Sequence, residues 1–178
     1  VVLIAKDNKM HSILSSQFEK REIKKEYFGI TWGNWNEKEG EITDNIKRKR
    51  SDPTSYQIDN QGREAITLYK VIKSGLYTSE VVFYPRTGRT HQIRVHAASR
   101  KYPIFGDNKY GGGENKSTGF IPEISKKLIQ TLKNFKRHAL HAKKITFFHP
   151  YLNDDFSIES PIPKDILLLK KDLREINE

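Results

Sequence analysis

Cysteine is absent from this chain of 178 residues. Its absence excludes disulfides, thiolate catalysis and cysteine-ligated zinc, and it agrees with a reducing compartment. No apolar run approaches the roughly 18 residues that a membrane-spanning helix needs, and no stretch combines the charged and apolar regions of a secretory signal. We therefore expect a cytoplasmic domain with no membrane partner, long enough to bury a real core.

Acidic residues are the scarcer charged type. The chain has 22 Asp and Glu against 32 Lys and Arg, which gives a formal net charge of +10 and a pI of about 9.6. Such an excess on one domain favours a polyanionic partner. Solvated lysine-rich faces would give the same numbers, so charge alone leaves both interpretations open.

Periodicity predicts the secondary structure. Alternating or apolar runs indicate strands at residues 1–6, 24–32, 40–46, 65–73, 77–85, 140–148 and 155–159. Helical spacing indicates helices at residues 8–18 (capped by Asp7), 90–100, 123–135 and 164–173. Polar or Gly-rich composition predicts loops at 47–60 and 106–119. The pattern predicts an α+β fold with a mixed, largely antiparallel sheet and flanking helices.

The segment 86–96, with sequence RTGRTHQIRVH, carries the densest group of chemical side chains. Gly88 permits a sharp turn after a strand, and Thr87 or Thr90 is predicted to cap the following helix. A helix start favours an anion. The basic side chains near it are Arg86, Arg89, His91 and Arg94, and a spacing of three puts His91 and Arg94 on one side. Arginine there suits a carboxylate or phosphate, but ordinary surface ion pairs remain an alternative.

Tyr27 lies in a predicted strand behind Lys24 and Lys25. A tyrosine beside two lysines can stack on an unpaired base while the lysines bind phosphate. Without further context, a core or edge-strand tyrosine is the simpler interpretation.

Two other patterns do not support a cofactor. His138, His141 and His149 match no metal-ligand spacing and have no acidic cluster, so we expect no metal and interpret His141 and His149 as hydrogen-bonding residues. The glycines at 111–113 lack the Gly-Lys-Ser/Thr ending of a phosphate loop, which makes a nucleotide-binding metabolic enzyme a poor alternative.

Several motifs in order resemble the RluA-type pseudouridine synthases. RTGRTHQIRVH is followed by the family's P-I-x-G-D-x-x-Y-G pattern at residues 103–111. RHALHAKKITFFHP resembles its R-x-x-L-H-A block, KKEYFGITW its K-x-Y segment, and SPIPKDI its closing P-x-P-x-D pattern. The resemblance covers nearly the whole chain.

The resemblance implies an isomerase that converts uridine to pseudouridine in structured ribosomal or transfer RNA without a cofactor. By motif position it implies that Arg94 is the arginine paired with the catalytic aspartate, Tyr27 the tyrosine beside the flipped base, and Leu140 the apolar pocket wall. We expect RNA contacts from Lys24, Lys25, Arg86, Arg89, His91 and Gln92. Tyr27 either stacks on the uracil or helps remove its C5 proton.

The family's catalytic aspartate lies in an HRLD motif, and no HRLD occurs in residues 1–178. In the family, that motif precedes a strand resembling residues 1–6. Neither Asp7 nor Asp107 matches its position. We therefore expect residues 1–178 to be the C-terminal portion of a single catalytic domain, inactive alone. The alternative is a non-catalytic RNA-binding module with the same fold.

Overall fold

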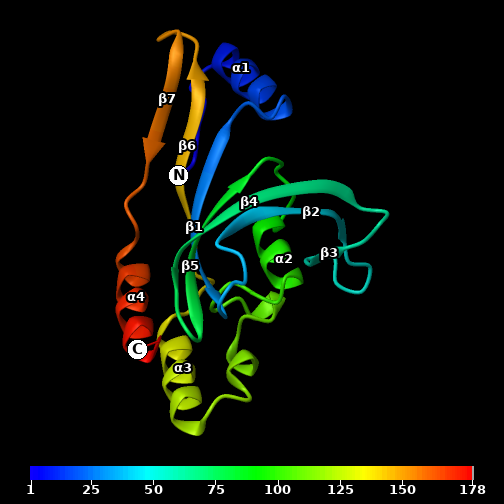
Figure 1. Ribbon diagram of the computed structural model, residues 1–178. Helices are drawn as coiled ribbons and strands as arrows, with labels where there is room; N and C mark the ends of the chain where they lie inside the picture. The colour runs from blue at the N-terminus through cyan, green and yellow to red at the C-terminus, as the bar shows by residue number, and fades with distance from the viewer. Residues whose placement is uncertain (178) are drawn as a thin grey trace.

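The computed structural model describes residues 1–177 and confirms the α+β prediction. Its strands form one seven-stranded sheet in the order β3-β2-β4-β5-β1-β6-β7, in which every neighbouring pair is antiparallel (Figure 1). The strands are β1 Lys24–Trp32, β2 Glu39–Arg48, β3 Tyr56–Ile58, β4 Arg63–Ser74, β5 Thr78–Pro85, β6 Leu140–His149 and β7 Asp154–Glu159. The α-helices are α1 Asn8–Glu19, α2 Gln92–Ser99, α3 Pro122–Asn134 and α4 Lys164–Asn177.

The centre of the sheet is buried on both faces. Residues 28–32 of β1 are all buried, because α4 covers one face and the segment from α2 to α3 covers the other. Phe28 points toward α4, where the Lys170 ammonium lies 5.2 Å from its ring centroid. Burial of Trp32, Phe83 and Leu128 in one apolar cluster supplies the main hydrophobic stabilisation.

The chain order places distant segments side by side. After β5, the chain passes through α2 and α3 and returns as β6 on the far side of β1. Tyr27 of β1 therefore lies opposite Phe83 of β5 on one side and Ala142 of β6 on the other.

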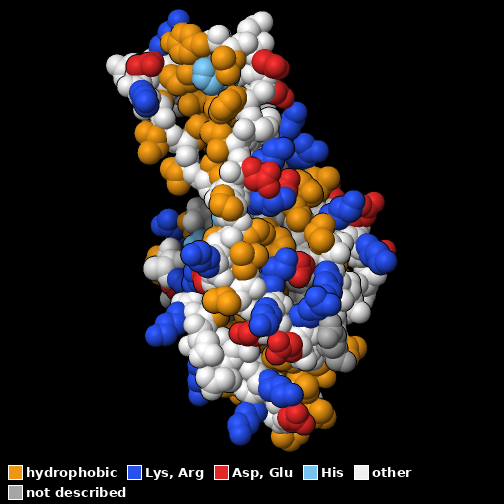
Figure 2. All heavy atoms as spheres, turned by 90° about the vertical axis from the view of Figure 1, so that its left-hand side faces the viewer, with side chains coloured by type: hydrophobic (Ala, Val, Ile, Leu, Met, Phe, Trp, Pro, Cys, Tyr) orange, Lys and Arg blue, Asp and Glu red, His pale blue; other side chains and the backbone are white. Residues whose placement is uncertain are grey.

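A second, smaller core forms where α1 packs on the β6–β7 hairpin. Leu14, Ile145 and Phe147 are buried there, and the Gln17 amide makes two hydrogen bonds with the backbone of Phe148. Asp7 caps α1 as predicted, because its carboxylate accepts from the Met10 N–H at 2.7 Å. Exposed apolar side chains gather at this end of the molecule (Figure 2).

The prediction of a buried strand at residues 1–6 is wrong. The segment pairs with no strand, and Val2 and Ile4 are 83% and 80% exposed while the alternate side chains pack on the second core. Within the predicted loops, residues 47–60 contain the short strand β3, and residues 106–119 contain the 3-10 turns η1 Asn108–Tyr110 and η2 Glu114–Ser117. The strand at 24–32 has the predicted ends, and the other predicted elements are present with shifted ends.

Candidate functional site

One hollow brings together the three residues that motif position singled out. Tyr27 of β1, Leu140 of β6 and Arg94 of α2 line a pocket of about 370 Å³. Lys25, Arg89 and His91 add basic or polar groups to its wall, and Phe18, Pro85 and Ile93 add apolar ones. The pocket thus combines an apolar wall, an aromatic ring and a guanidinium group, an arrangement suited to a flat polar ligand with an anionic neighbour.

A glycine makes room for the apolar wall. Gly29 pairs with Leu140 across β1 and β6, and a Cβ at this position would come within 3.1 Å of the Phe83 ring and 3.3 Å of the Leu140 side chain. Because Gly29 has no side chain, Leu140 and Phe83 can approach each other over the strand. The local sequence of β1 therefore positions the wall next to Tyr27.

Arg94 is held by a carboxylate within the chain. Its Nε and Nη2 donate to the two oxygens of Asp107 at 2.7 Å each, and the two side chains are only 14% and 1% exposed. The Tyr110 ring lies under the guanidinium, with Cζ 4.8 Å from the ring centroid. The hydrogen bonds to Asp107 raise the pKa of Arg94, so the group is a fixed positive charge.

Asp107 and Tyr110 hold Arg94, and neither was assigned a role from the sequence. Both belong to the Gly-Asp-x-x-Tyr pattern, which was available as a signal. Two glycines shape their loop. Gly106 has φ +77°, and a Cβ there would lie 2.4 Å from the Arg137 carbonyl oxygen, while one at Gly112 would meet the Ile104 oxygen. The loop can therefore fold tightly enough to turn Asp107 under α2.

His91 adjoins Arg94 because both contact Tyr110, although His91 precedes α2 and does not share a helix face with Arg94. The His91 Nδ1 lies 2.8 Å from the Tyr110 hydroxyl, which also accepts from the Tyr56 N–H at 3.0 Å. Burial, and then the charge of Arg94, lower the pKa of both His91 and His138. The lowered pKa values favour the neutral form of both imidazoles, so arginine and lysine supply most of the positive charge at the pocket.

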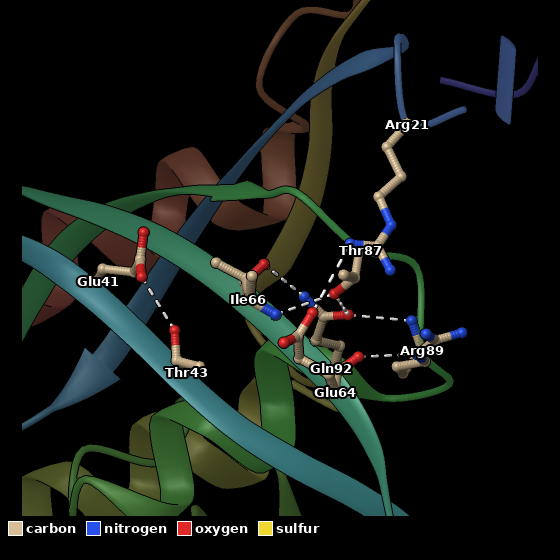
Figure 3. Close-up of polar contacts among 8 residues, drawn as sticks. All are labelled: Arg21, Glu41, Thr43, Glu64, Ile66, Thr87, Arg89 and Gln92. Carbon is tan, nitrogen blue, oxygen red and sulfur yellow. Dashed lines mark hydrogen bonds and ion pairs between the residues drawn. The ribbon is translucent and has the colours of Figure 1, made fainter. Parts of the chain in front are cut away.

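Gln92 fixes the turn that leads into α2 (Figure 3). Its Oε1 accepts from the Thr87 hydroxyl at 2.6 Å and from the Arg89 N–H at 2.9 Å, and its Nε2 donates to the Ile66 carbonyl at 2.9 Å. Only 4% of Gln92 is exposed. The side chain expected to contact RNA is thus occupied within the protein, and it ties the turn to β4.

The prediction of a threonine cap for the helix after residue 90 is wrong. No side chain caps α2, whose N-cap is His91 in the left-handed conformation (φ +56°). Thr87 donates to Gln92 instead. The helix therefore begins at Gln92, two residues later than the periodicity predicted.

The other predicted RNA contacts divide into two groups. Lys25 donates to the Thr87 carbonyl at 3.4 Å, and burial lowers its pKa; with Arg89 it lines the Tyr27 pocket. Lys24 and Arg86 are exposed and line a neighbouring hollow beside Tyr84, which shares Lys25 and Pro85 with the pocket. The structure therefore brings Lys25, Arg89 and His91 to the pocket but does not bring Lys24 and Arg86 there.

Two further motif residues support the site from behind. Arg137, of the R-x-x-L-H-A block, pairs with Asp165 of the P-x-P-x-D pattern at 2.6 and 3.0 Å, and it donates to the Leu140 carbonyl at 3.3 Å. This joins α4 to the start of β6. The position of Leu140 therefore depends on both blocks.

Neither a metal cluster nor a membrane span is found in the part of the chain that the structure describes. Residues 1–177 contain no group of three His, Cys, Asp or Glu side chains placed to hold a metal, and no helix there is long and apolar enough to cross a bilayer. His141 and His149 make hydrogen bonds, to the Ser160 carbonyl and from the Leu152 N–H at 3.3 Å each, as predicted.

Comparison with known proteins gives a consistent result. Residues 1–99 match the family described as RNA pseudouridylate synthase. The chain is 36% identical over 167 residues to the Bacillus subtilis (strain 168) protein named "Uncharacterized RNA pseudouridine synthase YhcT", covering 93% of this chain and 49% of that protein. It is 34% identical over 169 residues to "Ribosomal large subunit pseudouridine synthase D" of Blochmanniella floridana, covering 95% and 52%.

A solved structure has the same fold. The structure titled "Human RNA Pseudouridylate Synthase Domain Containing 4" superposes with a TM-score of 0.74 at 25% identity, covering 94% of this chain and 69% of that one. The chain spans about half the length of the curated relatives that it matches. Because the family match covers more than half of the 178 residues, the chain belongs to the RNA pseudouridylate synthase family.

Proposed function

We propose that this chain forms the uracil-binding and arginine-bearing part of an RNA pseudouridine synthase that acts on structured ribosomal or transfer RNA in the cytoplasm without a cofactor. The observation that carries the proposal is the convergence of Tyr27, Leu140 and Arg94 in one pocket. The reaction breaks the bond between uracil N1 and ribose C1′ and joins C1′ to uracil C5, with loss of the C5 proton and protonation of N1.

The pocket side chains have distinct roles in this proposal. A uridine must leave its stack, at a cost of a few kcal/mol, before it can enter the pocket. Tyr27 stacks on the extruded uracil and Leu140 packs against it from β6. Burial raises the pKa of the Tyr27 phenol, so the ring is neutral and acts as a stacking surface.

Arg94 stabilises the ionised form of a carboxylate. That carboxylate either attacks C1′ or stabilises the positive charge that develops on the sugar. Its Nε and Nη2 already donate to Asp107, so the incoming carboxylate meets the outer edge of the guanidinium. Asp107 is a poor candidate for the nucleophile. Both of its oxygens are hydrogen-bonded, its side chain is 1% exposed, and it does not line the pocket.

Residues 1–178 are therefore proposed to be inactive alone, because they contain no HRLD motif. The test is to incubate the chain with ribosomal and transfer RNA and to map pseudouridine at nucleotide resolution. The same chain with an HRLD-bearing segment placed ahead of Val1 should form product. Product from residues 1–178 alone would contradict our account of the nucleophile.

A non-catalytic RNA-binding module is the second candidate. The observation that favours it is that Asp107 already neutralises Arg94 inside the chain. The two candidates differ in one outcome of the same experiment. A module would bind RNA but would form no pseudouridine even after the HRLD segment is added.

A further inference from the structure

A second basic groove adjoins the Tyr27 pocket. It lies on strands β2 to β4, which form the edge of the sheet opposite β6–β7 (Figure 1). We name it the hairpin groove, because Lys47, Arg48, Tyr56, Gln61 and Arg63 of the β2–β3–β4 edge form most of its wall. Gly88 and Arg89 line both the groove and the pocket, so the two hollows are continuous. Beyond Arg48 the groove opens toward Arg50 and Asn60.

The cations of the groove have no ion-pair partner within the described chain, although Asp59 interacts electrostatically with Lys47 and Arg50. Over residues 1–177, no carboxylate lies within ion-pair distance of Lys47, Arg48, Arg50 or Arg63. Lys47 donates to the Gln61 amide oxygen at 2.8 Å, and Arg48 to the Tyr56 hydroxyl at 3.2 Å, both neutral acceptors. These cations therefore remain available to bind an anionic ligand.

The two nearby acidic groups, Asp52 and Asp59, accept hydrogen bonds within the turns that they stabilise. The Asp52 carboxylate accepts from Ser55 and Thr54, and these hydrogen bonds lower its pKa to about 2. Asp59, at the outer end, accepts from the Gln61 N–H at 2.9 Å. Both groups shape the loops, and the groove keeps a net positive wall.

The hairpin has a fixed position relative to the pocket. The Tyr56 N–H donates to the Tyr110 hydroxyl, the same group that contacts His91 beside Arg94. Lys109 donates to the Thr54 carbonyl at 3.2 Å from the other side of the loop. A ligand in the groove is therefore held in register with a base in the pocket.

We infer that the hairpin groove binds the phosphate backbone of the RNA strand that flanks the nucleotide in the Tyr27 pocket. This inference rests on the proposed function, because it assigns the groove to the same RNA. Unpaired cations interleaved with Tyr56 and the Gln61 amide are typical of surfaces that bind nucleic-acid backbones. Arg48, Arg63 and Arg89 all line this hollow, so one bound strand can contact each of them through its phosphates.

The test measures binding of residues 1–178 to a structured RNA hairpin by fluorescence anisotropy over a range of salt concentrations. The triple variant Lys47→Gln, Arg50→Gln and Arg63→Gln removes three groove charges. The control Lys126→Gln, Lys133→Gln and Lys171→Gln removes the same net charge from exposed positions on α3 and α4. Circular dichroism melting of both variants checks that each is folded.

The groove variant should bind at least tenfold more weakly at low salt. The slope of log affinity against log salt should fall in magnitude by about 2, since each phosphate contact contributes about 0.7 to 0.9. The control should keep the wild-type slope. Equal losses in the two variants, or no loss in the groove variant, would overturn the inference while the pseudouridine assay could still succeed. A wild-type chain that does not bind RNA would overturn both.

Discussion

Two bidentate arginine–aspartate pairs in this chain have nearly the same geometry and different surroundings. Arg94 and Asp107 meet at 2.7 Å with side chains 14% and 1% exposed. Arg137 and Asp165 meet at 2.6 and 3.0 Å with side chains 39% and 46% exposed. Each pair joins two different motif blocks, 13 residues apart for Arg94 and Asp107 and 28 residues apart for Arg137 and Asp165.

Burial decides what each pair does. In the interior, the pairing is strong and an unpaired partner is costly, so Asp107 fixes Arg94 as a charge at the pocket wall. At the surface, solvent screens the attraction, so Asp165 mainly restrains Arg137 behind Leu140. The buried pair thus positions the Arg94 guanidinium at the pocket, whereas the exposed pair joins α4 to β6.

The largest expected effect follows from breaking the buried pair. Asp107→Asn keeps the shape of the side chain but leaves Arg94 without a counter-charge. The free energy of unfolding of residues 1–178 should fall by about 3–5 kcal/mol in urea denaturation, the usual cost of removing one partner of a buried pair. A loss below 1 kcal/mol would mean that burial does not distinguish the two pairs.

The next prediction concerns His96, a second buried residue of α2. His96 is fully buried; its Nδ1 contacts the Thr67 hydroxyl, and its Nε2 has no hydrogen-bond partner among residues 1–177. Burial lowers its pKa from 6.5 to about 4, although Asp44 opposes the shift and Arg100 adds to it. Because the pKa of His96 is lower in the folded state, the unfolded state takes up the proton first as the pH falls. The free energy of unfolding is therefore highest above pH 6.5 and decreases as the pH falls from 6.5 to 4.

The expected loss is about 3 kcal/mol in the free energy of unfolding, at about 1.4 kcal/mol per pKa unit. Urea denaturation at pH 7 and pH 4 measures it. His96→Gln should shrink the difference between the two pH values by that amount. An unchanged difference in the variant would show that carboxylates alone cause the acid effect.

A smaller effect separates the ring of Tyr110 from its hydroxyl. Tyr110→Phe keeps the ring under Arg94 but leaves the Tyr56 N–H and His91 without their shared partner. Unfolding should become easier by about 1–2 kcal/mol, the cost of unsatisfied polar groups. A variant as stable as wild type would mean that water replaces the hydroxyl.

The smallest effect concerns the exposed pair. Asp165→Asn should lower the free energy of unfolding by less than about 1 kcal/mol, because solvent already screens this pair. Urea denaturation beside Asp107→Asn gives the direct comparison. A loss as large as that of the Asp107 variant would remove the distinction between the two pairs.

Hydrophobic patterns over neighbouring residues correctly predicted several helices and strands. The strand at residues 24–32 has the predicted ends, and Leu128 and Leu132 of α3 are buried as their spacing indicated. Residues 1–6 were wrongly predicted, because an apolar run does not show whether a strand has a partner. Helix α2 begins late because the left-handed conformation of His91 depends on tertiary contacts with Tyr110 and Tyr56.

The pocket was predictable only through motif order. Tyr27, Arg94 and Leu140 have no local signal that joins them, and the sheet topology brings them together. Asp107 was not assigned, because its partner lies on another element and because the family's catalytic aspartate belongs to the HRLD motif. Gln92 was expected at the RNA, although its amide is used within the fold.

Arg94 is proposed to act in the chemical step and not in RNA affinity. The direct measurement is single-turnover pseudouridine formation by the Arg94→Gln variant of the chain extended with an HRLD-bearing segment, at saturating RNA. The account predicts a rate lower by about 10²–10³, as for removal of one preorganised electrostatic group, with RNA affinity close to that of the parent. A parental rate, or a loss confined to RNA affinity, would contradict it.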